Sequence, residues 1–276
     1  MTGQNTPTSG AGDTAARADL AERAARAGGA VASGFFRRRV AVETKAGKTD
    51  VVTRADRDAQ RQVIAAVRTE YAEDAVVGEE EDELKEVPET GAAWIIDPVD
   101  GTNNFVREIP VWATSVAAVV DGRPVAAANV LPELGDVYTA DAEGAYRNGE
   151  AVSVSAESDP EAMMVAPTLW WDRNHRDAYA AACRETVERF GDLRRVGSAQ
   201  ATLSMVAAGS LDGAFTNLSA NPWDAVAGAL LVERAGGTVT DLAGEPWRHD
   251  ARGLVASNGR AHDQLLAAAR AVEDVD

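Results

Sequence analysis

The stretch "AWIIDPVDGTNNF", residues 93–105, decides how the rest of the chain is interpreted. It begins as an apolar run typical of a buried strand, and it ends in Asp97 and Asp100, followed by Gly101 and Thr102. Asp, Pro and Gly form turns for local reasons, so a plain turn is one interpretation. A buried strand that runs into carboxylates is also typical of a functional site. The stretch alone leaves both interpretations open.

Acidic residues follow apolar strands or begin helices at three further places: Asp56, Glu79 with Glu80, and Asp224. Carboxylates at strand ends can converge at one edge of a sheet, and several together need cations to stay ionised. Oxygen ligands without nearby Cys or His suit Mg²⁺, and the histidines at positions 175, 249 and 262 lack metal-ligand spacing. Two Mg²⁺ about 4 Å apart would bind a phosphate, activate a water and stabilise the leaving oxygen. The sequence therefore predicts a metal-dependent phosphatase site, with zinc disfavoured.

Composition narrows the partners and the location. The net charge of −17 argues against nucleic acid or an anionic membrane as a partner, because both attract basic surfaces. Cys183 is the only cysteine, and the polar N-terminus has no secretion signal, so we expect a cytoplasmic protein. Only three of the 27 basic residues are lysines, a pattern of either an acidic halophile-like protein or a GC-rich genome.

The order of the expected elements predicts two lobes. Residues 1–12 form a disordered tail, 13–158 an N-terminal α+β lobe with most metal ligands, and 159–276 a C-terminal α/β lobe carrying Asp224 and the substrate-side helix. We expect a long helix over 13–36, a hairpin around Asp121-Gly122, and later a strand at "RRVG" before a helix that starts near Ser198. The pattern implies helices and sheets in layers.

Three segments together resemble a known family. "GEEED", "WIIDPVDGTNNF" and "WDAVAGALLVERAGG" resemble the signature segments of the inositol monophosphatase family, the lithium-sensitive, Mg²⁺-dependent phosphomonoesterases. The resemblance covers nearly the whole chain, to "ASN" near its end. It implies a layered α-β-α-β-α sandwich of the inositol monophosphatase and fructose-1,6-bisphosphatase type, in the α+β or α/β class. It also implies two or three Mg²⁺ per active site, a small phosphate ester as substrate, and a homodimer.

The resemblance also implies the metal ligands and the residues around the attacking water. Glu79, Asp97 and the carbonyl of Val99 would bind one Mg²⁺, and Asp97, Asp100 and Asp224 the second. The water would be positioned by Glu79 and Thr102, and Asp56 would orient Thr102. A plain helix cap is the alternative role for Asp56.

The remaining implied roles concern the substrate and the surroundings of the site. Substrate contacts would come from Gly101, Thr102, Gly197, Ser198 and Ala199, and Lys45, or alternatively Lys48, would be the loop lysine near the metals. Glu80, Glu81, Asp82 and Glu83 are expected to form a solvated acidic loop, and Trp94 and Trp223 to lie in the core. Inositol-specific members carry a glutamate where this sequence has Asn217, so we expect relaxed specificity among sugar and polyol phosphates.

Several functions compete with hydrolysis of inositol monophosphate. Fructose-1,6-bisphosphate and 3′-phosphoadenosine 5′-phosphate are alternative substrates within the same family. A haloacid dehalogenase-type phosphatase needs two aspartates two residues apart, whereas Asp97 and Asp100 are three apart. A non-catalytic regulator that binds Mg²⁺ or a sugar phosphate is the alternative from another class.

Overall fold

The structure is a computed structural model that describes residues 11–38, 42–44, 51–80, 83–169 and 171–273. Lys45, Lys48 and most of the predicted disordered tail lie outside these residues, so those predictions are not addressed by it.

Two sheets form the framework, and a separate strand pair, β1 (Val42–Thr44) and β2 (Val51–Thr53), lies near the first of them. The larger sheet has seven strands in sequence order: β3 (Ala75–Gly78), β4 (Ala92–Asp100), β5 (Ala113–Val120), β6 (Arg123–Leu131), β7 (Asp136–Ala140), β8 (Ala145–Arg147) and β9 (Glu150–Ala151). In it β3 runs parallel to β4, and every other pair of neighbouring strands is antiparallel. The smaller sheet has the order β11-β10-β12-β14-β13, formed by β10 (Met164–Pro167), β11 (Asp192–Leu193), β12 (Gly213–Ser219), β13 (Thr238–Thr240) and β14 (Arg252–Ser257). In it β10 runs parallel to β11 and β12, and β14 runs antiparallel to β12 and β13.

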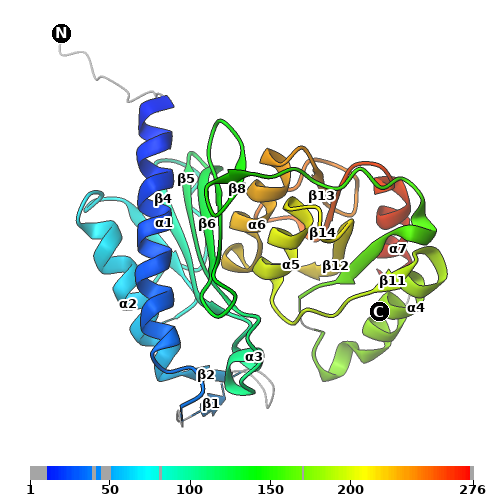
Figure 1. Cartoon of the computed structure of the whole chain (residues 1–276), viewed down its shortest axis with the longest axis horizontal. Coiled ribbons are helices and arrows are strands. Elements are labelled where there is room, and N and C mark those ends of the chain that lie inside the picture. Colours follow the sequence, from blue (N-terminus) through cyan, green and yellow to red (C-terminus); the bar gives the residue numbers. More distant parts are fainter. Residues whose placement is uncertain (1–10, 39–41, 45–50, 81–82, 170, 274–276) are drawn as a thin grey trace.

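Helices cover both sheets, which makes the molecule a sandwich of five layers (Figure 1). The outer helices of the larger sheet are α1 (Ala11–Ser33) and α2 (Arg54–Arg68), and those of the smaller sheet are α4 (Arg176–Arg189) and α7 (His262–Glu273). Between the sheets lie α5 (Ala199–Ala207) and α6 (Pro222–Arg234), whose apolar residues form one cluster with both sheets. A short helix, α3 (Thr102–Val106), follows β4, and 3₁₀ turns occupy Pro160–Ala162 and Arg173–His175. The α-β-α-β-α prediction is confirmed.

The apolar pattern of each element explains its layer. In α2, Ala55, Ala59, Val63 and Val67 recur at fourfold spacing and are buried. All but the first residue of β4 are buried, because helices cover both faces of the sheet at this strand. Trp94 and Trp223 lie in the core clusters, as predicted.

Turn residues explain one correct and one wrong prediction. The β5–β6 hairpin turns at Asp121 and Gly122, both with positive φ (49° and 71°), the geometry that tight hairpins require. The strand expected at "RRVG" is wrong, because β11 ends at Leu193 and the chain leaves the sheet. Gly197, with φ of 82°, then turns it into the start of α5.

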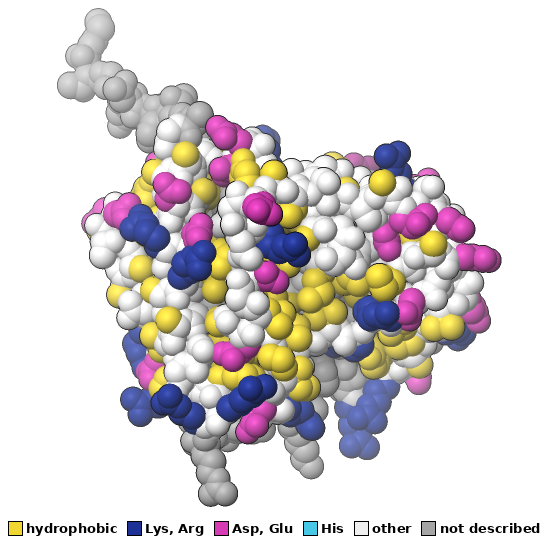
Figure 2. Space-filling model, viewed as in Figure 1, with side chains coloured by type: hydrophobic (Ala, Val, Ile, Leu, Met, Phe, Trp, Pro, Cys, Tyr) yellow, Lys and Arg dark blue, Asp and Glu magenta, His cyan; other side chains and the backbone are white. Residues whose placement is uncertain are grey.

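The proposed boundary near residue 158 falls in the segment that joins the two sheets, between β9 and β10. No helix in the described parts of the chain has the length and apolar character needed to cross a membrane. On the face in Figure 2, basic and acidic side chains are interspersed, and hydrophobic side chains gather toward the middle.

The close packing of α1 on α2 gives a test of this layer. A Cβ at Gly28 would lie 2.5 Å from Cγ2 of Val63 and 3.3 Å from the carbonyl oxygen of Ala59, so no side chain fits between the helices. Alanine normally stabilises a helix interior relative to glycine, but overpacking costs about 1–3 kcal/mol. We therefore expect Gly28→Ala to lower the free energy of unfolding in urea. Gly12→Ala, in the same helix with no atom within 4 Å of the new Cβ, is the control and should be neutral or stabilising. Equal effects of the two substitutions would contradict this packing.

Candidate functional site

The end of β4 carries the irregularity that builds the site. Side chains alternate along a strand, so residues three apart such as Asp97 and Asp100 would point to opposite faces. In β4, Asp97 pairs with Ser115 and Asp100 pairs with Ala113, so one extra residue is inserted as a β-bulge. The bulge is held by the backbone N–H of Val99, which donates to Oδ1 of Asp97 at 3.0 Å. The bulge turns both carboxylates to the same side of the sheet.

Asp100 binds the beginning of α5. Its carboxylate accepts hydrogen bonds from the hydroxyl of Ser198 and from the backbone N–H groups of Ala199 (3.2 Å) and Gln200 (2.7 Å). These N–H groups have no partner within the helix, and the positive end of the helix dipole favours the carboxylate. A residue of the larger sheet therefore fixes the start of a helix from the other lobe.

Asp224 comes from the first turn of α6. Pro222 occupies the first helical position, where its missing N–H costs nothing, and Asp224 follows two residues later. The backbone N–H of Asn221 donates to the Asp224 carboxylate at 3.2 Å, and the Asn221 side chain donates to it at 2.9 Å. This local cap holds the Asp224 side chain in place.

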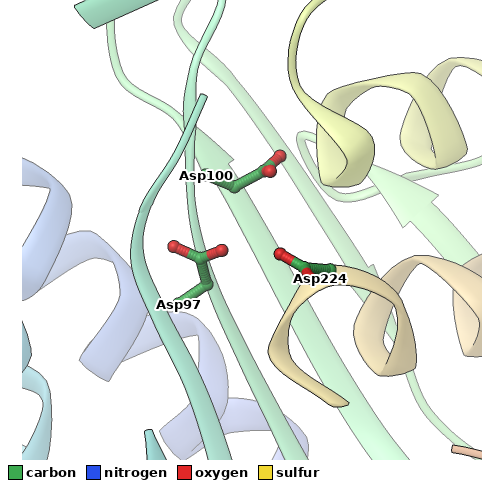
Figure 3. Close-up of side chains that lie close together, drawn as sticks. All are labelled: Asp97, Asp100 and Asp224. Carbon is green, nitrogen blue, oxygen red and sulfur yellow. The ribbon is translucent and has the colours of Figure 1, made fainter. Parts of the chain in front are cut away.

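The three aspartates converge (Figure 3). One carboxylate oxygen from each of Asp97, Asp100 and Asp224 lies within 4.8 Å of the other two. Asp97 and Asp100 are buried, and Asp224 is partly exposed. These are the three residues that the family resemblance assigns to the second Mg²⁺. Three oxygens at this spacing fit a hard divalent cation.

Glu79 lies beside this cluster. It directly follows β3, and its backbone N–H donates to the carbonyl of Ile96, the residue before Asp97, at 3.3 Å. Its carboxylate is near enough to Asp97 and Asp224 to raise the pKa of both. Glu79 and Asp97, two of the predicted ligands of the first Mg²⁺, are thus neighbours across parallel strands.

Asp56 and Thr102 form a pair at the other side of the bulge. The hydroxyl of Thr102 lies 3.3 Å from Oδ1 of Asp56 and 3.1 Å from the carbonyl oxygen of Val99. Asp56 is completely buried and is the third residue of α2, inside the helix and not in front of it as a cap would be. The contact with Thr102 is the arrangement that the orienting role requires.

The predicted substrate-side residues meet where α3 and α5 begin. Gly101 has φ of 96°, and a Cβ there would lie 3.1 Å from Cβ of Ser198 and 3.2 Å from the carbonyl oxygen of Gly197. Ser198 and Ala199 are buried and bind Asp100. Their role toward a substrate stays a prediction, whereas their contact with Asp100 is direct.

Asn217 is held inside the smaller lobe. It lies near the end of β12 and is 1% exposed, and its Oδ1 accepts a hydrogen bond from the indole N–H of Trp171 at 2.8 Å. Because the side chain is buried, a contact with substrate hydroxyls requires the surroundings of Asn217 to open. The substrate contact of Asn217 stays a prediction.

Two residues near the site were not singled out from the sequence. Gln200, a polar residue on the apolar face of α5, donates to the carbonyl of Trp223 at 2.7 Å and so ties α5 to the turn that carries Asp224. Lys85 Nζ donates to the carbonyls of Gly78 (2.7 Å) and Glu79 (3.1 Å) and lies 5.6 Å from the ring centroid of Trp223. In the sequence, Gln200 stands out only as a glutamine in a segment rich in small and apolar residues. Nothing in the sequence points to Lys85 except that lysine is rare in this chain.

Glu80 corrects one prediction. It was expected in a solvated acidic loop with Glu81, Asp82 and Glu83, yet Glu80 is 5% exposed. Its backbone is bonded to the side chain of Gln60, which draws the residue inward. Glu83 is partly exposed, and positions 81 and 82 lie outside the described residues.

The carboxylates carry the electrostatic signature of a cation site. Burial raises the pKa of Asp97 well above the usual range, and the charges of Glu79 and Asp100 raise it further. Burial, Glu79 and Asp100 raise the pKa of Asp224 to about 7. Burial also raises the pKa of Asp100, although the hydrogen bonds from Ser198 and Gln200 oppose that shift. A divalent cation would compensate this repulsion, so the donor set fits Mg²⁺ in charge and in chemistry.

Comparison with known proteins agrees with this geometry. The model of the inositol monophosphatase family matches residues 14–274. The chain belongs to the inositol monophosphatase family.

Relatives within the inositol monophosphatase family cover most of the chain. "Nus factor SuhB" from Escherichia coli strain K12 is 33% identical over 252 residues, which cover 90% of this chain and 94% of the relative. "Fructose-1,6-bisphosphatase/inositol-1-monophosphatase" from Thermotoga maritima is 33% identical over 228 residues, with 82% and 84% covered. The solved structure of a Thermotoga maritima IMPase has a TM-score of 0.86 at 30% identity, covering 95% of this chain and 100% of that chain. The family indicates phosphatase activity, and the differing names leave the substrate open.

The raised pKa values predict how stability depends on pH in this family member. Folded Asp97 and Asp224 hold protons that the unfolded chain, with aspartate pKa near 3.9, has lost. Without metal, the free energy of unfolding should therefore fall as pH rises from about 4 through 7. Mg²⁺ should restore more stability at pH 8 than at pH 5, since it competes with protons.

Urea unfolding in EDTA and in Mg²⁺ measures both effects. Asp224→Asn should flatten the fall in EDTA, whereas the exposed Asp19→Asn should leave it unchanged. An Asp224→Asn protein with the wild-type pH profile would show that this carboxyl does not titrate as described.

Proposed function

We propose that this protein is a Mg²⁺-dependent phosphoric monoester hydrolase that acts on inositol monophosphate or a related sugar or polyol phosphate. The observation that carries the proposal is the convergence of Asp97, Asp100 and Asp224 within 4.8 Å, with Glu79 beside them. Membership of the inositol monophosphatase family supports the same reaction class.

The metal ligands follow from the donor set. Asp97, Asp100 and Asp224 would hold one Mg²⁺, and Glu79, Asp97 and the carbonyl of Val99 would hold another. The proposal is for two or three Mg²⁺ per active site. When bound, Mg²⁺ would polarise the phosphate oxygens and lower the pKa of water. Val99 already shares its carbonyl with the Thr102 hydroxyl, and a carbonyl oxygen has two lone pairs, so both contacts are compatible.

The residues around the bulge would align the attacking water. The Thr102 hydroxyl has one proton to donate, and Asp56 and Val99 both lie where they can accept it. With that proton committed, an oxygen lone pair of Thr102 is left to accept a hydrogen bond from water. The Glu79 carboxylate would accept the water's other proton. Asp56 therefore acts through Thr102, as an orienting residue.

The phosphate would sit against Gly101 and Thr102. Gly101 has no side chain and a φ of 96°, so the backbone at the start of α3 can approach a phosphate closely. Gly197 and Ser198 lie next to Gly101, and Ala199 binds Asp100; these three residues would border the ring of the substrate. Lys45 keeps its proposed role as a loop cation near the metals.

Substrate choice is proposed to be relaxed. Asn217 offers a neutral amide where inositol-specific members carry a carboxylate, and its oxygen is bound to Trp171. Charge-assisted hydrogen bonds are about twice as strong as neutral ones, so vicinal hydroxyls would be held less tightly here. Fructose-1,6-bisphosphate and 3′-phosphoadenosine 5′-phosphate remain alternative substrates, the first supported by the name of the Thermotoga maritima relative.

A regulatory function is the second candidate. The relative from Escherichia coli is named a Nus factor and not a phosphatase, and this name is the observation behind the second candidate. A non-catalytic descendant has no need to keep every ligand, yet Glu79, Asp97, Asp100, Thr102 and Asp224 are all present. The intact site favours catalysis.

Three further features belong to the proposal. Sensitivity to Li⁺ would follow from its entry between Asp100 and Asp224. A homodimer is supported by the hydrophobic side chains gathered on the face in Figure 2. A cytoplasmic location is supported by the single cysteine.

A panel of phosphomonoesters assayed with Mg²⁺ tests the proposal. Wild-type protein should hydrolyse several sugar and polyol phosphates, with inositol 1-phosphate preferred by less than about a hundredfold, since one charge-assisted contact is worth 1.5–3 kcal/mol. Asp97→Asn should abolish turnover, because it removes charge from both metal positions. Near-normal kcat in Asp97→Asn at saturating Mg²⁺ would contradict the proposed site. Absence of turnover by the wild type on the whole panel would favour the regulatory candidate.

A further inference from the structure

The strand end that carries Glu79 is held by a side chain from another layer. Gln60, on α2, accepts a hydrogen bond from the backbone N–H of Glu80 at 2.9 Å and donates one to the Glu80 carbonyl at 2.6 Å. An N–H can only donate and a carbonyl can only accept, so these partners fix which end of the amide faces which group. Gln60 thus pairs with the backbone as a neighbouring strand would.

The pair is fully enclosed. Gln60 is 0% exposed and Glu80 is 5% exposed, so water does not replace these hydrogen bonds if they are lost. Gly78 makes room for the amide, because a Cβ at Gly78 would lie 2.8 Å from Oε1 and 3.1 Å from Cδ of Gln60. Glu79 lies between these two contacts, and its own N–H is bound to Ile96. The backbone around Glu79 is therefore fixed on both sides.

The same face of α2 reaches the other half of the site. Asp56 precedes Gln60 by four residues, so the two side chains lie one above the other on one helix face. Asp56 binds the hydroxyl of Thr102, and Gln60 binds the backbone next to Glu79. Both are completely buried, which is unusual for polar residues without a specific task. One helix, α2, therefore contacts both Thr102 and the backbone next to Glu79, the two residues proposed to align the water.

We propose that Gln60 is a positioning residue, which sets the place of the Glu79 carboxylate relative to Asp97 and Thr102 for metal binding and catalysis. Gln60 touches neither metal nor substrate and acts through the backbone of Glu80. The inference rests on the metal site proposed above. It adds that Asp56 and Gln60, on one face of α2, together position Thr102 and Glu79.

Mn²⁺ binding to the substrate-free protein, followed by electron paramagnetic resonance, tests this role without turnover. Gln60→Met keeps the length of the side chain and loses both hydrogen bonds. Removing a residue that orients a ligand typically costs 10–100-fold in metal affinity, so we expect the Kd for Mn²⁺ to rise at least about tenfold. We expect kcat/KM to fall with it.

Two controls separate positioning from general loss of stability. Gln62→Met makes the same chemical change on the exposed face of α2 and should leave the Kd unchanged. Thr186→Val removes a buried hydrogen bond to the carbonyl of Ala182 in α4, far along the chain from the site, and should lower the Tm without changing the Kd. An equal rise in Kd in Thr186→Val would overturn the proposal.

Gly78→Ala approaches the same contact from the other side and serves if Gln60→Met folds poorly. Its methyl group would displace the Gln60 amide, so we expect weaker Mn²⁺ binding, and in the double variant the two losses should be less than additive. Wild-type Mn²⁺ affinity in folded Gln60→Met or in Gly78→Ala would overturn the role of Gln60 while leaving the proposed function intact. A wild-type protein that binds no Mn²⁺ would overturn both.

Discussion

Oxygens of Asp97, Asp100 and Asp224 lie within 4.8 Å of one another, where their negative charges repel. Burial strengthens this repulsion, because the surroundings screen charge less than water does. Burial raises the pKa of all three carboxyls, and repulsion raises those of Asp97 and Asp224 further, the latter to about 7. A divalent cation bound among the three carboxylates would compensate this repulsion. Without a cation, contacts within the fold must hold the three carboxylates together against their repulsion.

Each carboxylate is held by different contacts: those of Asp97 and Asp224 are local, and those of Asp100 join two layers. The bulge in β4 turns Asp97 and Asp100 to one side, and the start of α5 binds Asp100 across the lobes. The first turn of α6 fixes Asp224, and Gln200 connects α5 to the residue before it. On the opposite side of the sheet, α2 holds Thr102 and the backbone beside Glu79. The aspartate cluster therefore draws on both halves of the chain, with Asp97 and Asp100 from β4 and Asp224 from α6.

The spacing of apolar residues predicted helices and sheets in layers, and the resemblance of three segments predicted the family. Acidic residues after apolar runs or at helix starts pointed to the three aspartates that the structure brings together, and their role as metal ligands stays a prediction. The bulge could not be predicted, because a separation of three places Asp97 and Asp100 on opposite faces of a regular strand, and only pairing with β5 reveals the extra residue. Gln60 and Glu80 were missed for a related reason. Their pairing joins residues 20 apart, and a buried glutamine looks like a surface one until its partner is known. Asn217 was chosen by its spacing from Asp224, which does not show that Trp171 binds it.

Anomalous diffraction from crystals of the wild-type protein soaked in Mn²⁺ tests the central claim directly, since Mn²⁺ takes the same oxygen ligands as Mg²⁺. The account predicts a strong peak among the carboxylates of Asp97, Asp100 and Asp224, at about 2.1 Å from an oxygen of each. A second peak beside Glu79 and the carbonyl of Val99 would complete the proposed pair. Crystals in which Mn²⁺ binds elsewhere, while these carboxylates keep their positions with no peak between them, would contradict it.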